Sequence, residues 1–265
     1  MMNNKAYTLI TGASSGLGRE FSIQCASKGM NVMMIALPGS NTLSLATQLI
    51  MEYEVDVQVF EFDLTDSYLL VRTLNELMNN FEINFLINNA GIGGTVSIME
   101  SSMESIDKII QLNVRGTVLV TQTLLPHLLK REKSHILNIS SMAAFTPIAY
   151  KTVYPASKAF ISSFFLGLRE ELQGTGVSVS VVYPGPIMTN SGVSARIVEQ
   201  GMKGRVGLLS AKEIAGIALR QALAGKGVII PGFWNRINHR LMSLLPTEIK
   251  LRIVSGAVKK EMAIR

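Results

Sequence analysis

Tyr154 and Lys158 are the residues whose types and spacing first suggest chemistry in this chain. Side chains four positions apart lie on one face of a helix, and Pro155 suits a helix start, where its missing N–H costs nothing. A phenol has a pKa of about 10 in water, and a neighbouring ammonium group lowers it by roughly 1–3 units. A tyrosine tuned in this way exchanges a proton near neutral pH, which predicts a proton-transfer site. The alternative is an ordinary amphipathic helix with a tyrosine at its edge.

A glycine-rich turn, Thr11-Gly12-x-x-x-Gly16-x-Gly18, follows an apolar run at residues 6–11 and precedes a helical pattern. Such a turn suits a dinucleotide, because glycines let the backbone approach a pyrophosphate and the helix N-terminus favours its charge. A plain strand-to-helix turn is the alternative. The strand expected at residues 31–37 ends at Leu37, where such folds often carry an acid for a ribose or an arginine for a 2′-phosphate. This position therefore leaves NAD and NADP open.

Polar residues also follow the strands expected at residues 55–62, 85–87 and 135–139. They are Asp63, the pair Asn88-Asn89 and the pair Ser140-Ser141. Open parallel sheets bind ligands at the carboxyl ends of their strands, so these positions are candidates for one shared site. Structural roles remain the alternative, with Asp63 as a helix cap (although Asp66 is better placed) and the asparagines as turn formers.

Asn113 lies inside a long helix that we expect to start at a capping box of Ser101 and Glu104 and to end near Lys130. A polar side chain on a buried helix face needs a partner, so Asn113 is either structural or functional. The remaining pattern gives helices at 43–51, 69–80, 154–173 and 210–224 and strands at 177–182 and 228–230. This alternation predicts a single doubly wound α/β domain, with the polar stretch 190–209 as a binding loop.

The bulk composition excludes several classes of protein. The chain has 265 residues, 48% of them hydrophobic, and a formal net charge of +6, which is too mild to indicate a nucleic-acid partner. The single cysteine, Cys25, cannot form an internal disulfide, and no run reaches the ~18 apolar residues of a membrane span. The N-terminus leads straight into a strand, so we expect no signal peptide and a cytoplasmic protein. Since its three histidines (His127, His135, His239) are not clustered with other ligands, we expect no metal site.

In order and separation, the motifs resemble those of the classical short-chain dehydrogenase/reductase family over about residues 5–232. The matching elements are the glycine turn, Asp63-Leu64, Asn88-Asn89-Ala90-Gly91, Asn113, Ser141, Tyr154-x-x-x-Lys158 and Pro184-Gly185. The resemblance implies a Rossmann-like sheet of about seven parallel strands, a nicotinamide cofactor, and a homodimer or homotetramer.

The resemblance also implies catalytic roles for Asn113, Ser141, Tyr154 and Lys158. In the reductive direction, Tyr154 protonates the substrate oxygen while a hydride reaches the carbonyl carbon. Lys158 keeps the tyrosine's pKa low and holds the nicotinamide ribose, and Ser141 hydrogen-bonds the substrate oxygen. Asn113 holds a water that connects Lys158 to solvent. Ser140 is the rival of Ser141, and the spacing to Tyr154 favours Ser141.

The cofactor contacts that the resemblance implies come from the turns at the strand ends and from the catalytic pair. They are Gly12, Ser14, Ser15, Gly16, Leu17, Gly18, Asp63, Leu64, Asn89, Ala90, Gly91, Tyr154, Lys158, Pro184, Gly185, Ile187 and Thr189. Asp63 would contact the adenine, and Asn89 and Ala90 the adenosine side. Ile187 and Thr189 would contact the nicotinamide amide.

Residues 233–265 extend past the last strand of the catalytic domain, which we place at residues 1–232. This extension contains an apolar stripe at helical spacing, formed by Phe233, Trp234, Ile237, Leu241, Leu244 and Leu245. Arg236, His239 and Arg240 lie elsewhere on the same helix. Pro246 ends this segment, and a second, basic helix follows it. We expect this helical C-terminal extension to pack on the domain or at a subunit interface, with His239 exposed or interfacial. The less favoured alternatives are a peripheral contact with a membrane surface and a cover over an apolar substrate.

The first functional hypothesis is an NAD(P)-dependent oxidoreductase acting on a ketone or secondary alcohol, with an apolar substrate such as a 3-ketoacyl, sphingoid or steroid-like compound. NADP(H) is favoured over NAD(H), because Leu37 stands where an acid would select NAD and Arg19 follows the third glycine. The alternative is a catalytically silent dinucleotide sensor or scaffold, which has no need of all four catalytic residues. The four-residue step from Tyr154 to Lys158 disfavours an enoyl reductase, and the glycine spacing disfavours a sugar epimerase.

Overall fold

A single parallel sheet forms the core of the computed structural model, which describes residues 6–186 and 207–263. The strands stand in the order β3-β2-β1-β4-β5-β6-β7. Their bounds are β1 Ala6–Thr11, β2 Asn31–Ala36, β3 Val57–Glu61, β4 Glu82–Asn88, β5 Ser134–Ile139, β6 Val177–Val182 and β7 Val228–Ile229. The prediction of a doubly wound Rossmann-like sheet is confirmed. Ile187, Thr189 and the expected loop 190–209, except for its last residues, lie outside the described residues.

The strands form where apolar residues run almost without interruption, as expected for a sheet covered on both faces. All six residues of β5 are buried, and five of the six in β6. Chain order reverses between β1 and β4, which are neighbours in the sheet. Ligands bind at such a switch point, beyond the carboxyl ends of the strands, and the glycine turn and Asn89 both follow these two strands.

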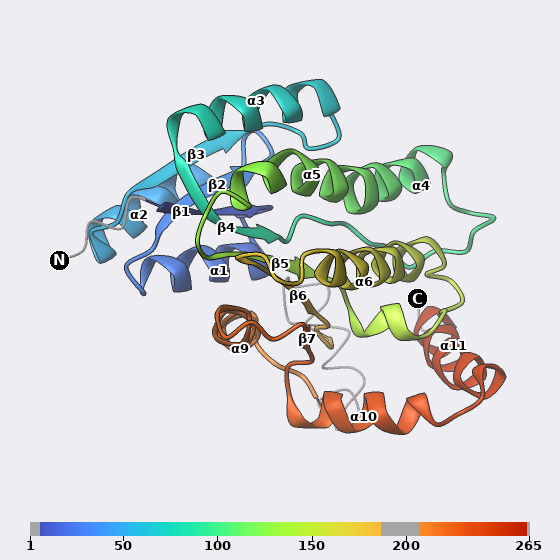
Figure 1. Ribbon diagram of the computed structural model, residues 1–265. Coiled ribbons are helices and arrows are strands. Elements are labelled where there is room, and N and C mark those ends of the chain that lie inside the picture. Colours follow the sequence, from blue (N-terminus) through green and yellow to red (C-terminus); the bar gives the residue numbers. More distant parts are fainter. Residues whose placement is uncertain (1–5, 187–206, 264–265) are drawn as a thin grey trace.

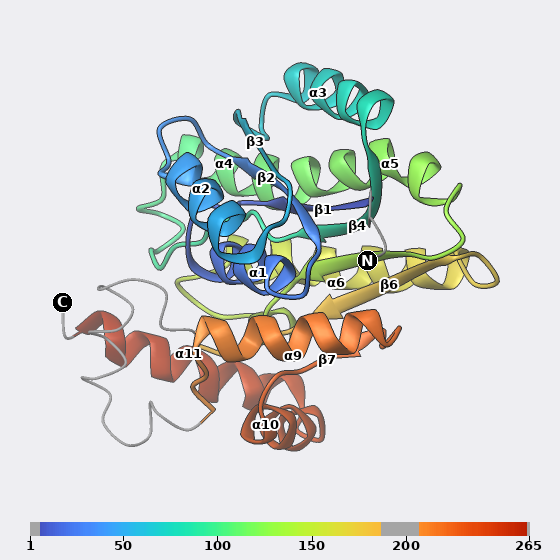
Figure 2. The ribbon, with the colours of Figure 1, turned by 90° about the vertical axis from the view of Figure 1, so that its left-hand side faces the viewer.

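Helices cover both faces of the sheet (Figures 1 and 2). On one face, Phe21, Leu49 and Leu219 are buried in an apolar core beneath α1, α2 and α9, and the second core lies beneath α3, α5 and α6. The bounds of these helices and of α4 are α1 Gly16–Ala26, α2 Thr42–Tyr53, α3 Ser67–Asn80, α4 Met103–Ile110, α5 Thr117–Leu128, α6 Val153–Glu171 and α9 Ala211–Leu223.

The long helix predicted between Ser101 and Lys130 differs from the prediction in two ways: its N-cap is another residue, and its backbone is interrupted. Its N-cap is Ser102, whose hydroxyl accepts a hydrogen bond from the Ser105 N–H, while the Ser101 hydroxyl donates to the Ser97 carbonyl. Between α4 and α5 the backbone widens into a π-helical turn, Gln111–Gly116. Single π turns are frequent at functional sites, and this one contains Asn113.

Two helices, α10 Phe233–Ser243 and α11 Thr247–Ala263, form the extension. In Figure 1, α10 runs along the lower edge of the molecule, below β7 and α9, and α11 stands at the right-hand side. The apolar stripe was expected to pack on the domain or at a subunit interface, and within the single chain four of its members do not pack on the domain: Phe233, Trp234, Leu241 and Leu244 are 62%, 57%, 60% and 81% exposed. The reason is that α10 turns Asn235 and His239 toward the domain instead.

Candidate active site

The predicted catalytic residues converge at the carboxyl end of β5. Ser141 follows this strand and caps a 3₁₀ turn at Met142–Phe145, since its hydroxyl accepts from the Ala143 N–H at 3.1 Å. Tyr154 lies in the first turn of α6, where the Ser141 side chain is near enough to lower the pKa of its phenol. The two hydroxyls can therefore act on one substrate oxygen.

Ser140 and Ser141 point in different directions. The Ser140 side chain is 2% exposed and donates to the main-chain carbonyl of Lys158 at 2.8 Å, which ties β5 to α6. Only Ser141 reaches Tyr154. The geometry thus agrees with the choice of Ser141 and gives Ser140 a positioning role.

Lys158 is 5% exposed, and its Nζ donates to the Ile139 carbonyl at 2.8 Å. The same Nζ lies 5.9 Å from the centroid of the Tyr154 ring. Burial disfavours the charged ammonium and lowers the pKa of Lys158 to about 8. The lysine is therefore held beside the tyrosine in an environment that costs it part of its charge at mildly alkaline pH.

The pKa of Tyr154 is raised, not lowered, in the chain by itself. Burial raises the pKa of the Tyr154 phenol, and the hydrogen bond with Ser141 opposes that rise. The expectation that Lys158 keeps this pKa low is not met, because desolvation of the phenolate is the largest effect on this side chain.

Asn113 is buried, and its amide is bonded on both sides. Its Oδ1 accepts from the Ile92 N–H at 2.9 Å, and its Nδ2 donates to the Ile92 carbonyl at 2.8 Å and to the Ser157 hydroxyl at 3.0 Å. Both hydrogens of the Asn113 amide are thus donated to protein groups, so Asn113 can bind a water near Lys158 only by accepting a hydrogen bond at an oxygen. Ser157, which sequence reasoning missed, joins this network to α6 beside the catalytic lysine.

Gly91 and Gly93 let the strand-end backbone pass close to the catalytic side chains. A Cβ on Gly91 would lie 3.2 Å from both Asn113 Oδ1 and Lys158 Nζ. A Cβ on Gly93 would lie 2.8 Å from Cδ2 of Tyr154, which is too close for the ring to keep its place. The sequence analysis did not identify Gly93 as a site residue, although it lies only two residues after the Asn-Asn-Ala-Gly motif.

The glycine turn has the geometry of an anion-binding helix start. Gly12 and Gly16 have φ values of +65° and +51°, and a Cβ on Gly18 would lie 2.0 Å from the Gly12 carbonyl oxygen. Ser15 is the exposed N-cap of α1, with no side-chain hydrogen bond to the helix, so the first-turn N–H groups of Gly16 and Leu17 lack a side-chain acceptor. These residues fit a dinucleotide pyrophosphate.

The remaining glycine-turn candidates contribute less directly. The Leu17 side chain is buried in the apolar core, which leaves only its backbone for a ligand, and Ser14 is half-buried. Asn89 donates from Nδ2 to the Thr11 and Gly12 carbonyls at 3.0 and 3.1 Å. The Thr11 hydroxyl in turn accepts from the backbone N–H groups of Asn89 and Ala90. Asn89 therefore holds the turn between β1 and β4, and Thr11 is a positioning residue that sequence reasoning did not single out.

Asn88, Asp63 and Leu64 have mainly structural contacts. Asn88 donates to Thr121 and Asn138 inside the core at 2.9 and 2.8 Å. The Asp63 carboxylate accepts from the Thr65 N–H at 2.9 Å, and the neighbouring cap of α3 is Asp66, as predicted. Leu64 is 7% exposed and packs in the core beneath α3 and α5, so a cofactor could reach it only through its backbone.

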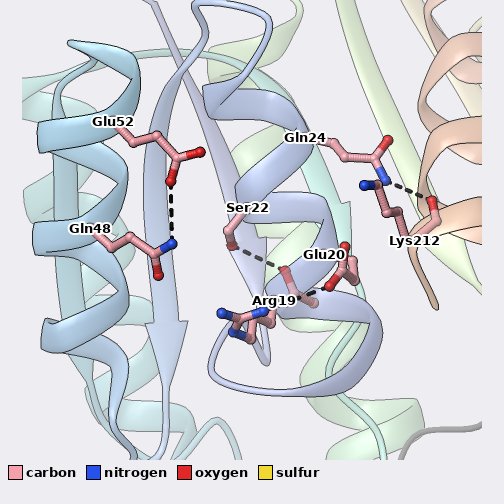
Figure 3. A network of polar contacts seen from close by, with 8 residues as sticks. Arg19, Glu20, Ser22, Gln24, Gln48, Glu52 and Lys212 are labelled. Carbon is pink, nitrogen blue, oxygen red and sulfur yellow. Dashed lines mark hydrogen bonds and ion pairs between the residues drawn. The ribbon is translucent and has the colours of Figure 1, made fainter.

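The adenosine end of the site presents charges of both signs. Figure 3 shows Arg19 beside Glu20, with a guanidinium–carboxylate distance of 3.7 Å. Glu61, at the end of β3, accepts from the Gly39 N–H at 3.3 Å, in the turn that follows β2. Leu37 is 53% exposed in that turn. An acid does approach the end of β2, and it comes from the neighbouring strand.

The other side of the site is joined to the extension. The Pro184 carbonyl accepts from the Met142 N–H at 2.9 Å, and a Cβ on Gly185 would lie 2.8 Å from the Asn235 amide of α10. Phe145 stacks on Tyr183 at 4.5 Å between ring centroids and on His239 at 4.1 Å. His239, expected to be exposed or interfacial, is half-buried in this stack.

An apolar cavity of about 410 Å³ lies between the segment that follows Ser141, the first turns of α6, and α11. Ala143, Ile148, Pro155 and Leu251 are among its lining residues. The Ser255 hydroxyl of α11 accepts from the Ala149 N–H at 3.1 Å beside it. The extension thus contributes side chains to the surroundings of the catalytic segment.

The part of the chain that the structure describes contains neither a cluster of metal ligands nor a membrane-spanning helix. There, no three His, Cys, Asp or Glu side chains gather as they would around a metal ion. Nor is any helix within residues 6–186 and 207–263 long and apolar enough to cross a membrane.

Comparison with known proteins places the site in a family. Residues 6–199, which include all four predicted catalytic residues, match the family model of short chain dehydrogenases. The chain is 32% identical to a very-long-chain 3-oxoacyl-CoA reductase of Eremothecium gossypii over 67% of its length, and the match spans about half (53%) of that protein. It is 28% identical to human 17-beta-hydroxysteroid dehydrogenase type 3 over 89% of its length and 79% of the relative.

A solved structure supports the same grouping. The short-chain dehydrogenase of Sphingobium yanoikuyae in complex with NADPH superimposes with a TM-score of 0.76 at 26% identity, over 90% of this chain and 94% of that one. This chain thus shares its overall fold with that enzyme over most of its length. The chain belongs to the short-chain dehydrogenase/reductase family of oxidoreductases.

Proposed function

We propose that the protein transfers a hydride between a nicotinamide cofactor and a ketone or secondary alcohol. The observation that carries this proposal is the convergence of Ser141, Tyr154 and Lys158, with Ser141 near enough to the Tyr154 phenol to lower its pKa and the lysine Nζ 5.9 Å from the centroid of the tyrosine ring. When bound, the cofactor supplies or accepts the hydride. In the reductive direction, the carbonyl carbon gains the hydride and its oxygen gains the tyrosine proton, which yields the alcohol.

Ser141 and Tyr154 act on the substrate oxygen, and Lys158 acts on Tyr154. The Ser141 hydroxyl donates a hydrogen bond that stabilises the developing negative charge. Tyr154 delivers the proton, and its raised pKa makes it the proton-bearing form at neutral pH. Lys158, with a pKa of about 8, is placed to attract the phenolate that remains and to regain its proton through a water held at the Asn113 side-chain oxygen, which like Lys158 Nζ lies close to Gly91.

We propose an apolar substrate of the 3-ketoacyl, sphingoid or steroid-like kind. The apolar cavity of about 410 Å³ next to the catalytic segment supports this, because Ala143 and Ile148 belong to the same segment as Ser141. The names of the fungal and human relatives point to long-chain acyl and steroid ketones. The match covers only about half (53%) of the fungal reductase, so the name of that relative does not suffice to assign a substrate class. The apolar cavity of this chain is therefore the second support for the proposal.

We also propose NADP(H) as the cofactor, on the basis of Arg19 and of Leu37 at the end of β2. Glu61 is the feature that opposes this choice, because its carboxylate hydrogen-bonds the turn after β2, where a 2′-phosphate would bring negative charge. The pair of variants Arg19→Ala and Glu61→Gln tests it. We expect Arg19→Ala to raise KM for NADPH alone and Glu61→Gln to lower it; an effect on NADH instead would reverse the assignment.

A homodimer or homotetramer is part of the proposal. The surface at α4 supports it, since Met99 and Met103 are 90% and 86% exposed and Ile110 is 43% exposed on the same part of the chain. Sedimentation velocity with Met103→Glu tests this surface, because a buried carboxylate would weaken assembly. An unchanged assembly would place the subunit contact elsewhere.

The function is tested by following cofactor oxidation in absorbance with NADPH and NADH separately. The substrates would be 3-ketoacyl chains, steroid ketones, small aldehydes and quinones, and Tyr154→Phe would serve as the control. We expect turnover on an apolar ketone and a loss of about 10²–10⁴-fold in Tyr154→Phe, as for removal of a general acid. Tight cofactor binding without turnover on any carbonyl would favour the silent sensor or scaffold instead.

A further inference from the structure

We propose that α10 docks the protein on an anionic membrane surface through its outer face, which we define as Phe233, Trp234, Ile237, Leu241 and Leu244. At 100° per residue, these five side chains fall within about one third of the helix circumference. Ile237 is half-buried, and the other four are 57–81% exposed. The inference goes beyond the proposed function and does not depend on it.

The outer face is exposed because the opposite side of α10 is held by the domain. Asn235 is 6% exposed, and its Nδ2 donates to the Gly207 and Pro231 carbonyls, both at 2.9 Å. One turn later, His239 stacks on Phe145. These contacts fix the rotation of the helix, so its apolar side points away from the core.

The residue types on the outer face are those of a membrane interface. Phe233 and Trp234 meet edge to face at 5.7 Å between ring centroids, at the start of the helix. Aromatic rings of this kind, with leucines on the same face, settle at the boundary between headgroups and acyl chains. Figure 1 shows α10 along one edge of the molecule, where a flat surface could approach it.

Charge distinguishes a lipid surface from a second copy of the chain. Arg236 and Arg240 flank the outer face, and neither forms an ion pair with any residue that the structure describes. Residues 233–259 contain five cationic residues against one acid, the full set being Arg236, Arg240, Lys250, Arg252, Lys259 and Glu248. Pairing this face with its own copy would bring arginines together, whereas anionic headgroups would neutralise them.

The exposed apolar surface at α4 lacks this charge pattern. Met99 and Met103 are accompanied there by Glu100, Glu104 and Asp107. An anionic bilayer would repel these carboxylates. The two surfaces therefore fit different partners, and only the outer face of α10 fits an anionic lipid surface.

Trp234 provides a site-specific probe, because it is the only tryptophan of the chain. Its emission would be recorded for the full chain with vesicles of phosphatidylcholine and of phosphatidylcholine mixed with phosphatidylserine, together with sedimentation of the vesicles. We expect a blue shift and co-sedimentation with the mixed vesicles at low salt, and their reversal at high salt. No shift and no co-sedimentation with the mixed vesicles would overturn the proposal.

Two double variants distinguish docking through α10 from nonspecific adsorption to vesicles. We expect Leu241→Glu/Leu244→Glu and Arg236→Gln/Arg240→Gln each to weaken vesicle binding by about tenfold or more. The control Ile50→Glu/Met51→Glu alters exposed apolar residues on α2 and should bind as the parent chain does. Equal binding by the Leu241/Leu244 variant would overturn the proposal. So would a self-association in sedimentation velocity that this variant abolishes, because the outer face would then be a subunit interface.

Discussion

The catalytic cluster and helix α10 both contain buried polar side chains, but they combine them with apolar residues in opposite ways. In the cluster, Asn113 and Lys158 are buried and hydrogen-bonded at the ends of apolar strands. In α10, Asn235 and His239 make the contacts with the domain, whereas Trp234 is turned outward. The usual division of a surface helix, with its apolar side in and its polar side out, is reversed in α10.

The comparison shows that a buried polar group can have one of two roles: it takes part in chemistry, or it fixes the orientation of a helix on the domain. A buried charge such as Lys158, with one carbonyl partner, costs stability, and the site retains it for its chemistry. A buried amide such as Asn235 has its partners nearby and fixes a helix against a turn. The predictions that follow test this division, beginning with the largest effect.

Lys158→Met should stabilise the fold at neutral pH. The pKa of Lys158 falls from an ordinary 10.5 to about 8 on folding, so the unfolded chain holds the proton more tightly. The resulting penalty is complete below pH 8 and disappears as the pH rises toward 10.5. We expect a gain of about 3 kcal/mol at pH 7, reduced by about 1 kcal/mol for the lost hydrogen bond to Ile139.

Urea unfolding of both proteins at pH 7 and near pH 10 measures this gain. The stability difference should shrink at the higher pH, because the parent lysine is then largely neutral in the folded state. The variant should also lack turnover. A difference that stays constant over the whole range would mean that Lys158 carries no burial penalty, and the contrast between the two regions would fail.

Asn235→Ala should destabilise the protein by about 2 kcal/mol, since the buried Pro231 carbonyl and the half-buried Gly207 carbonyl lose their donor. The matched control is Asn238→Ala, on the exposed side of the same helix, with an expected change within about 0.5 kcal/mol. Thermal unfolding of the two variants would compare them directly. Equal effects would show that Asn235 does not determine how α10 sits on the domain.

The sequence predicts the fold and the convergence of Ser141 and Tyr154, because both depend on local rules. Continuous apolar runs define strands wherever a sheet is covered on both faces, and the polar turns after them must meet at one edge. Ser141 and Tyr154 come together because Ser141 follows the strand β5 and Tyr154 lies in the first turn of the next long helix, α6. None of this requires knowledge of distant packing.

The features that the sequence did not predict depend on long-range contacts. The π turn at Asn113 follows from its bonds to Ile92 and Ser157, which come from other elements. The orientation of α10 depends on which turn accepts the Asn235 amide. The raised pKa of Tyr154 depends on how deeply the ring is buried. Helical periodicity gives the composition of each face but not the side that packs.

Gly93→Ala should lower kcat by about tenfold or more while cofactor binding changes little, because the new methyl group would displace the Tyr154 ring from its position. Gly94→Ala is the matched control, since a Cβ there meets no described atom within 4 Å. Steady-state kinetics on the best ketone would separate kcat from KM. If the two variants behaved alike, the close approach of the backbone to Tyr154 would have no role in positioning the ring.

His239→Ala should have the smallest effect, a loss of about 0.5–1.5 kcal/mol from the ring contact with Phe145. Burial, and then the nearby Lys250, lower the pKa of His239 below its ordinary value of 6.5, so the neutral ring is the packed form. The contribution of His239 is therefore present above pH 6.5 and declines as the pH falls through the lowered value. His239→Phe keeps a ring without the titration, and its unfolding free energy should depend less on pH than that of the parent between pH 5 and 7, roughly the range in which histidines titrate. Because His127 and His135 titrate in both proteins, the difference between the two curves isolates His239, and identical curves would show that the stack does not sense the charge of this ring.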